Sequence, residues 1–83
     1  MYKVIKAAAV SLLAKPWDKS HNAYKMEKFI RLAAQKNLDL VVLHEGVLEG
    51  YCVADVVLDP RRADEFATLA EPIDGPYVRR FHR

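Results

Sequence analysis

Two short apolar runs on either side of one amphipathic pattern constrain the fold of this chain more than any other feature. The first run predicts a strand over residues 3–12, and the second predicts a strand over residues 38–44. Nearly continuous apolarity of this kind is typical of strands that are covered on both faces. A strand, a helix and a second apolar strand form a βαβ unit, whose strands run parallel. We therefore expect an α/β fold.

The segment between the two runs predicts a helix over residues 20–36. Its apolar side chains recur at helical spacing, and its charged side chains fall mostly on the other faces. Asp18 or Ser20 can cap this helix, because a side-chain oxygen there accepts a hydrogen bond from a free backbone N–H. Asn37 tolerates a left-handed backbone conformation and therefore marks the expected end of the helix.

The remainder of the chain has weaker patterns. We expect a loop over residues 45–60, a short helix over 61–70 and the start of another helix over 76–83, with Pro76 in its first turn. Two strands are too few for the sheet that helices on both faces would cover. Residues 1–83 are therefore expected to form part of a domain rather than a complete one.

Composition excludes several classes of function. Thirteen Lys and Arg against eleven Asp and Glu give a net charge of +2, too little to indicate nucleic-acid binding. The basic cluster Arg79, Arg80 and Arg83 is typical of a solvated helix face or tail. No apolar run is long enough to span a membrane. The histidines are too widely spaced to predict a metal site, and the single cysteine excludes an internal disulfide, so a cytoplasmic protein with a reduced thiol is expected.

Glu45 is the candidate catalytic residue. Ligands of open parallel sheets bind beyond the carboxyl ends of the strands, and Glu45 directly follows the second apolar run. Partial desolvation there would raise the pKa of a carboxyl group towards the range useful for proton transfer. Gly46 and Gly50 allow a sharp turn or a close approach of the backbone. The alternative is a strand-terminal glutamate that simply faces water.

The segment around Glu45 resembles the first catalytic motif of the carbon–nitrogen hydrolase (nitrilase) superfamily. In that motif an apolar strand ends in a Glu and is followed several residues later by Gly-Tyr, here Gly50-Tyr51. The first strand, the helix that begins near Asn22 and the turn at residues 70–76 are also similar to features of that family. The likeness therefore extends over essentially the whole chain.

The resemblance implies the N-terminal part of an αββα sandwich that hydrolyses a small amide, carbamoyl compound or nitrile without a cofactor. It also implies a Glu–Lys–Cys triad and a homo-oligomer. Glu45 matches the general base of the triad, whereas the family's Lys and Cys lie in later motifs that have no counterpart here. We therefore expect no turnover from the isolated 83-residue chain.

Neighbouring residues admit a binding role or a packing role. His44 stands where the family usually has Pro, and it could contact Glu45 or the substrate or simply fill the position. Tyr51 is a candidate substrate-binding residue that is also suited to packing. Cys52 is expected to pack rather than to attack substrate, because cysteine is among the most often buried residue types. Trp17 is expected to anchor the loop between the first strand and the helix.

Two other classes of function remain open from the sequence. The chain could be a free-standing interaction module that associates with itself or with a complementing chain through exposed sheet edges. It could also be a small α/β domain of unrelated function, in which the motif at Glu45 is a coincidence.

Overall fold

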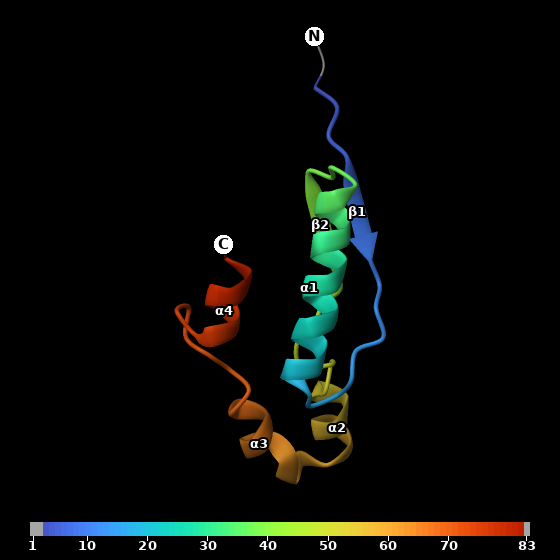
Figure 1. Cartoon of the computed structure of the whole chain (residues 1–83). Helices are drawn as coiled ribbons and strands as arrows, with labels where there is room; N and C mark the ends of the chain where they lie inside the picture. Colours follow the sequence, from blue (N-terminus) through green and yellow to red (C-terminus); the bar gives the residue numbers. More distant parts are fainter. Residues whose placement is uncertain (1–2, 83) are drawn as a thin grey trace.

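The computed structural model describes residues 3–82, and Arg83 of the basic cluster lies outside this range. The described chain runs from a parallel strand pair through a long helix to a series of short helices (Figure 1). In order, these elements are β1 (Ala7–Val10), α1 (Lys19–Gln35), β2 (Leu40–Leu43), α2 (Val53–Leu58), the 3₁₀ turn η1 (Pro60–Arg62), α3 (Ala63–Ala67) and α4 (Pro76–Phe81).

The two strands pair in parallel, as the βαβ pattern predicts. The register places Ala7 opposite Leu40 and Val10 opposite Leu43. Both strands are shorter than the expected ranges 3–12 and 38–44, because only the residues that face a partner in this register form a ladder. The α/β class is thus confirmed.

Only one face of the sheet is well covered. Strand residues alternate between exposed and half-buried positions, and α1 lies alongside the strand pair (Figure 1). Leu40 and Val42 are 52% and 51% exposed. The expectation that both strands are covered on both faces is therefore wrong for the described residues, which supply a helix for one face only.

The bounds of helix α1 agree closely with the helix expected over residues 20–36. The Asp18 side chain accepts a hydrogen bond from the His21 backbone N–H at 2.9 Å and so caps the first turn. Beyond the helix, Asn37 adopts the left-handed conformation with φ 57°. The buried positions of α1 are Asn22, Ala23, Met26 and Ala33.

The segment 45–60, expected to be a loop throughout, contains helix α2. Its sequence from Val53 to Leu58 is apolar almost all round and spans too few residues to show a helical period. The expected helix over 61–70 is split into η1 and α3. Helix α4 begins at Pro76, and Glu71 accepts hydrogen bonds from the free N–H groups of Tyr77 and Val78.

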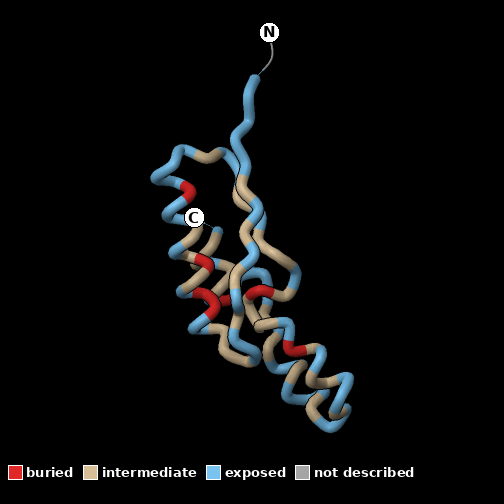
Figure 2. The backbone as a smooth tube through the Cα atoms, turned by 90° about the vertical axis from the view of Figure 1, so that its right-hand side faces the viewer, coloured by how far each residue is buried: buried red, intermediate tan, exposed pale blue. Residues whose placement is uncertain are grey.

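The described chain is elongated, with extents of 55 × 25 × 23 Å. Its radius of gyration is 15.2 Å, against about 12 Å for a compact domain of this length. Buried positions are few and separated along the tube (Figure 2). No helix within residues 3–82 is long and apolar enough to cross a membrane.

Candidate functional site

The candidate site is the tight segment from His44 to Cys52 that follows β2. Three of its residues have positive φ: Gly46 at 67°, Gly50 at 75° and Tyr51 at 53°. The Tyr51 N–H donates to the Gly46 carbonyl at 2.8 Å and closes the turn. The sharp turn that the two glycines predict is therefore confirmed, and it folds the segment back towards the start of α1.

Gly50 allows this segment to contact the loop before α1. A Cβ atom at position 50 would lie 2.6 Å from the Cα of Pro16 and would overlap the Lys15 carbonyl group. The Trp17 N–H donates to the Glu49 carbonyl at 3.0 Å beside this contact. Backbone meets backbone here, so no side-chain movement could make room for a larger residue.

The Asn22 side chain joins the same two loops. Its amide group accepts from the Lys15 N–H at 2.7 Å and donates to the carbonyls of Lys15 and Leu48, each at 2.8 Å. The residue is 0% exposed, and the three bonds satisfy its carbonyl oxygen and both amide hydrogens. Sequence reasoning missed this role, because an Asn near a helix start usually indicates a cap.

Glu45 lies just beyond the C-terminal end of β2, as expected, but its side chain is exposed. The expected partial desolvation of this carboxylate is therefore not provided by residues 3–82. The position of Glu45 rests on its backbone, which is held between the end of β2 and the Gly46–Tyr51 turn.

His44 contacts backbone rather than the Glu45 carboxylate. Its Nδ1 lies 3.0 Å from the backbone carbonyl oxygen of Glu45, and its Nε2 lies 3.0 Å from that of Leu12. The ring is half-buried between β2 and the chain that leaves β1. His44 therefore has structural contacts on both ring nitrogens in the described chain.

Tyr51 and Cys52 lie at the end of the segment and differ in exposure. Tyr51 is 52% exposed, and its ring approaches Gly46. Cys52 is only 1% exposed, and burial, followed by the negative charge of Glu49, raises the pKa of its thiol. A buried thiol that holds its proton is a poor nucleophile, so the packing role expected for Cys52 is confirmed.

Trp17 anchors more than the loop before α1. Its Nε1–H donates to Asp55 of α2 at 2.7 Å, the Arg62 guanidinium lies 4.0 Å from its ring centroid, and the Phe66 ring packs edge-on at 6.3 Å. Arg62 also pairs with Asp55 at 3.6 Å. These contacts join the start of α1 to α2 and α3, and they occupy the Asp55 carboxylate.

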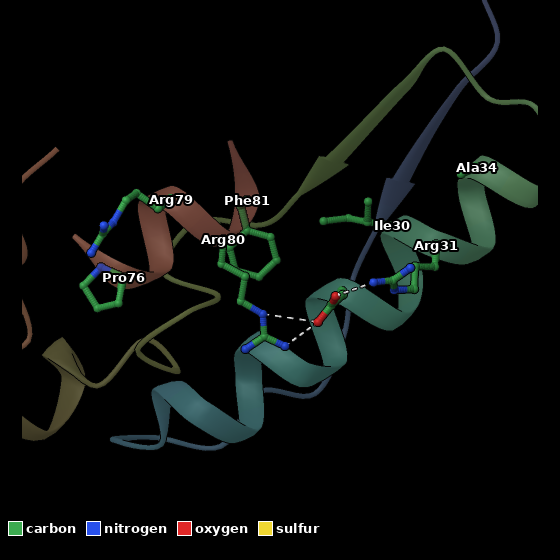
Figure 3. A pocket seen from close by; sticks show the side chains of 8 residues that line it. Ile30, Arg31, Ala34, Pro76, Arg79, Arg80 and Phe81 are labelled. Carbon is green, nitrogen blue, oxygen red and sulfur yellow. Dashed lines mark hydrogen bonds and ion pairs between the residues drawn. The ribbon is translucent and has the colours of Figure 1, made fainter. Parts of the chain in front are cut away.

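Two hollows of the described surface bear on the position of the candidate site. The larger, of about 780 Å³, lies between α1 and α4 and is lined by Ile30, Phe81 and several arginines (Figure 3). None of its lining residues belongs to the segment that carries Glu45. The smaller, of about 410 Å³, includes Leu48 and Glu49 of that segment together with side chains of α3 and α4. Within residues 3–82, no group of three or more His, Cys, Asp or Glu side chains is arranged to hold a metal ion.

In a parallel βαβ unit, an acidic residue beyond the carboxyl end of the second strand lies at the edge where open α/β sheets bind ligands. The family model described as carbon–nitrogen hydrolase matches residues 6–83, which is nearly the whole chain. The chain therefore belongs to the carbon–nitrogen hydrolase family, and the resemblance drawn from the motif at Glu45 is confirmed. No curated protein and no solved structure gives a significant match.

Proposed function

We propose that this chain is the N-terminal segment of a hydrolase that cleaves non-peptide C–N bonds, with Glu45 as its general base. Glu45 takes the proton of a Cys thiol, and the thiolate attacks the carbon of an amide, carbamoyl group or nitrile. A Lys and backbone N–H groups stabilise the charge that develops on the substrate. With an amide or carbamoyl substrate the C–N bond then breaks, and Glu45 returns its proton to the nitrogen that leaves as ammonia or an amine, so that a thioester remains. With a nitrile the nitrogen takes up the proton and stays bound as a thioimidate. Water then hydrolyses the thioester or thioimidate and frees the thiol.

The observation that carries this proposal is the position of Glu45 within the family match. It follows the second strand of a parallel pair, and the Asn22 and Gly50 contacts hold its segment against the rest of the fold. Cys52 is buried, and the Lys19 ammonium is bound to the Leu69 carbonyl at 2.7 Å. We therefore assign the Cys and Lys of the triad to residues outside these 83.

The rest of the proposal follows from the same assignment. The complete domain is an αββα sandwich, to which this chain contributes the strand pair and α1. Its substrate is a small amide, carbamoyl compound or nitrile, it needs no cofactor, and it works as a cytoplasmic homo-oligomer. The exposed Leu40 and Val42 and the elongated shape of the chain favour further protein packing on the open sheet face.

A hybrid enzyme tests the role of Glu45. Residues 6–83 replace the matching segment of an active carbon–nitrogen hydrolase, and ammonia release is measured with that enzyme's own substrate. We expect turnover from the hybrid, and we expect Glu45→Gln to lower kcat by at least about a thousandfold, because it removes the base and leaves the thiol protonated.

Glu49→Gln is the matched control, since it removes a carboxylate from the same segment. It should keep most of the activity of the hybrid. A hybrid that folds like its parent but has no turnover would contradict the proposal, as would an active Glu45→Gln variant. The isolated 83-residue chain should release no ammonia, and activity that Cys52→Ala abolishes would overturn the assignment of Cys52.

The open sheet face favours a second candidate, a self-associating module without catalysis. Leu40 and Val42 of β2 are half exposed on a face that no described element covers. Apolar faces of this kind mark interaction surfaces. Sedimentation velocity over a range of concentrations tests this candidate. Self-association that Val42→Thr weakens would favour it, and a monomer at all concentrations would contradict it.

A further inference from the structure

The imidazole of His44 connects the two strand exits that meet at the candidate site. Its Nε2 lies 3.0 Å from the carbonyl oxygen of Leu12, which follows β1, and its Nδ1 lies 3.0 Å from the carbonyl oxygen of Glu45 itself. The contact with Leu12 joins residues 32 positions apart in the sequence. One ring thus links the chain beyond β1 to the backbone of the proposed base.

Both neighbours of the ring are hydrogen-bond acceptors. A neutral imidazole carries one N–H and donates to one of these carbonyls at a time, whereas a doubly protonated ring donates to both. In either form the ring can serve as a donor to the Glu45 backbone or to its anchor at Leu12. Its contacts are therefore directed ones, unlike those of a side chain that only fills space.

In the resemblance described above the family usually has Pro at this position, and Pro fixes the backbone φ at about −65°. His44 leaves φ free, so the segment needs another restraint at the same point. The ring contacts with the Leu12 and Glu45 carbonyls supply one from outside the backbone, through one hydrogen bond in the neutral ring and two in the protonated ring. The restraint then depends on a side-chain contact with Leu12, beyond β1, rather than on a covalent ring.

We propose that His44 is a positioning residue that holds the backbone of Glu45 in place of the family's proline. This inference rests on the proposed role of Glu45 as general base. His44 touches neither substrate nor reacting atoms in this assignment. It acts by fixing the point from which the carboxylate extends, and its anchor is the carbonyl of Leu12.

The ring N–H protons of the 83-residue chain test the two contacts directly. In ¹⁵N-edited proton NMR spectra, a ring N–H of His44 should be visible, because hydrogen bonding and partial burial slow its exchange with water. His21 and His82 are exposed and serve as internal controls whose ring N–H signals should be lost to exchange. A His44 ring that behaves like these two would overturn the proposal.

Kinetics of the hybrid enzyme test the effect on the base. His44→Ala should lower kcat about tenfold to a hundredfold with little change in KM, since small misplacements of a catalytic group cost that much. His44→Pro should restore kcat towards the parent value, because it replaces the lost hydrogen bonds by a backbone constraint. Circular dichroism checks that each variant folds.

The outcomes separate this inference from the proposed function. If Glu45→Gln leaves the hybrid active, the proposed function itself fails. If Glu45→Gln abolishes turnover while His44→Ala keeps the parent kcat, only the role of His44 is overturned. A His44→Pro variant no better than His44→Ala would also overturn it.

Discussion

At the scale of single residues, two positions in this chain fix how the Glu45 segment sits against the rest of the fold. Gly50 allows the backbone of the Glu45 segment to contact the loop before α1. Asn22 of α1 makes three hydrogen bonds to these two loops, two with Lys15 and one with Leu48. Neither residue contributes much apolar burial. Their effect is to set a geometry that the small core alone would leave loose.

Gly50→Ala should therefore destabilise the chain severely. The new methyl group would overlap Lys15 and Pro16, and an L residue would be strained at φ 75°. Overpacking and left-handed strain together cost about 2–4 kcal/mol, a large part of the stability of so small a chain. Urea unfolding followed by circular dichroism measures the loss.

Gly75→Ala is the control for this prediction. Gly75 has a negative φ of −66°, and the three atoms nearest to a Cβ there all belong to the side chain of Glu71, which can shift more easily than backbone although it caps α4. It should cost clearly less than Gly50→Ala. An equal loss of unfolding free energy in the two variants would contradict the importance given to the contact of Gly50 with Lys15.

Asn22→Ala should leave three backbone groups without their partner. Each buried polar group that loses its hydrogen bond costs about 1–3 kcal/mol, although water can enter and relieve part of this loss. Lys28→Ala, an exposed change on the same helix, should have little effect. Thermal unfolding of both variants decides the matter, and a similar melting temperature for the two would contradict the role given to Asn22.

At the scale of elements, α1 is the part whose ends are defined most clearly. It begins after a capping carboxylate and ends before a left-handed Asn. The hydrogen bond from the His21 backbone N–H, followed by the charge of Lys15, lowers the pKa of Asp18 below its ordinary value of 3.8. A carboxyl with a lower pKa in the folded state stabilises that state above its unfolded pKa, and this contribution is lost as the pH falls through the folded value.

Asp18→Asn should separate this effect from the rest of the acid response. Asn keeps a side-chain oxygen that can cap α1 but does not titrate. Near neutral pH the variant should melt close to the parent, and between about pH 5 and about pH 2 its melting temperature should fall less steeply. Asp18→Ala should melt lower at every pH. Parallel curves for the parent and Asp18→Asn would contradict the assignment.

The elements also show which patterns a sequence carries by itself. The period of α1, the stop at Asn37 and the start of α4 at Pro76 are local, and each was predicted closely. Helix α2 was missed because six mostly apolar residues have no readable period. The extent of the strands depends on pairing register, and the burial of Asn22 depends on loops that lie 7 and 26 residues away. These features arise from tertiary contacts, which no local pattern contains.

The candidate site divides in the same way. The position of Glu45 at the end of β2 and the turns at Gly46 and Gly50 follow from the chain itself. The contacts of His44 with Leu12 and of Trp17 with Asp55 join distant segments and could not be read from spacing. The exposure of the Glu45 side chain depends on which tertiary contacts reach it, so no local pattern could predict it.

At the scale of the whole molecule, α4 is held to α1 largely through charge. Arg80 of α4 pairs with Glu27 of α1, and Glu27 also binds Arg31 on its own helix at 2.8 Å (Figure 3). Arg80, and then Arg31, lower the pKa of Glu27. The hollow between these helices shows that apolar packing there is incomplete.

Glu27→Gln should therefore loosen α4 without unfolding the strand pair. Amide hydrogen exchange should speed up in residues 77–81 of α4, while the amides of β2 keep their protection. Raised salt should have a similar effect on the parent, because screening weakens exposed ion pairs. Glu65→Gln, which removes a local pair with Arg62, is the control and should leave α4 unchanged. Unaltered exchange in α4 after Glu27→Gln would contradict this account.

The amide of Asn22 has a consequence for the order in which the chain folds during synthesis. All of its partners lie between Lys15 and Leu48, and the close contact of Gly50 is with Lys15 and Pro16. The segment that presents Glu45 can thus close as soon as residue 50 has left the ribosome, before α2 and the later helices exist. The entropy cost of closing a loop rises only slowly with the length of the loop. Ribosome-bound chains stalled at a length that places residue 50 just outside the exit tunnel should already protect this turn from proteolysis.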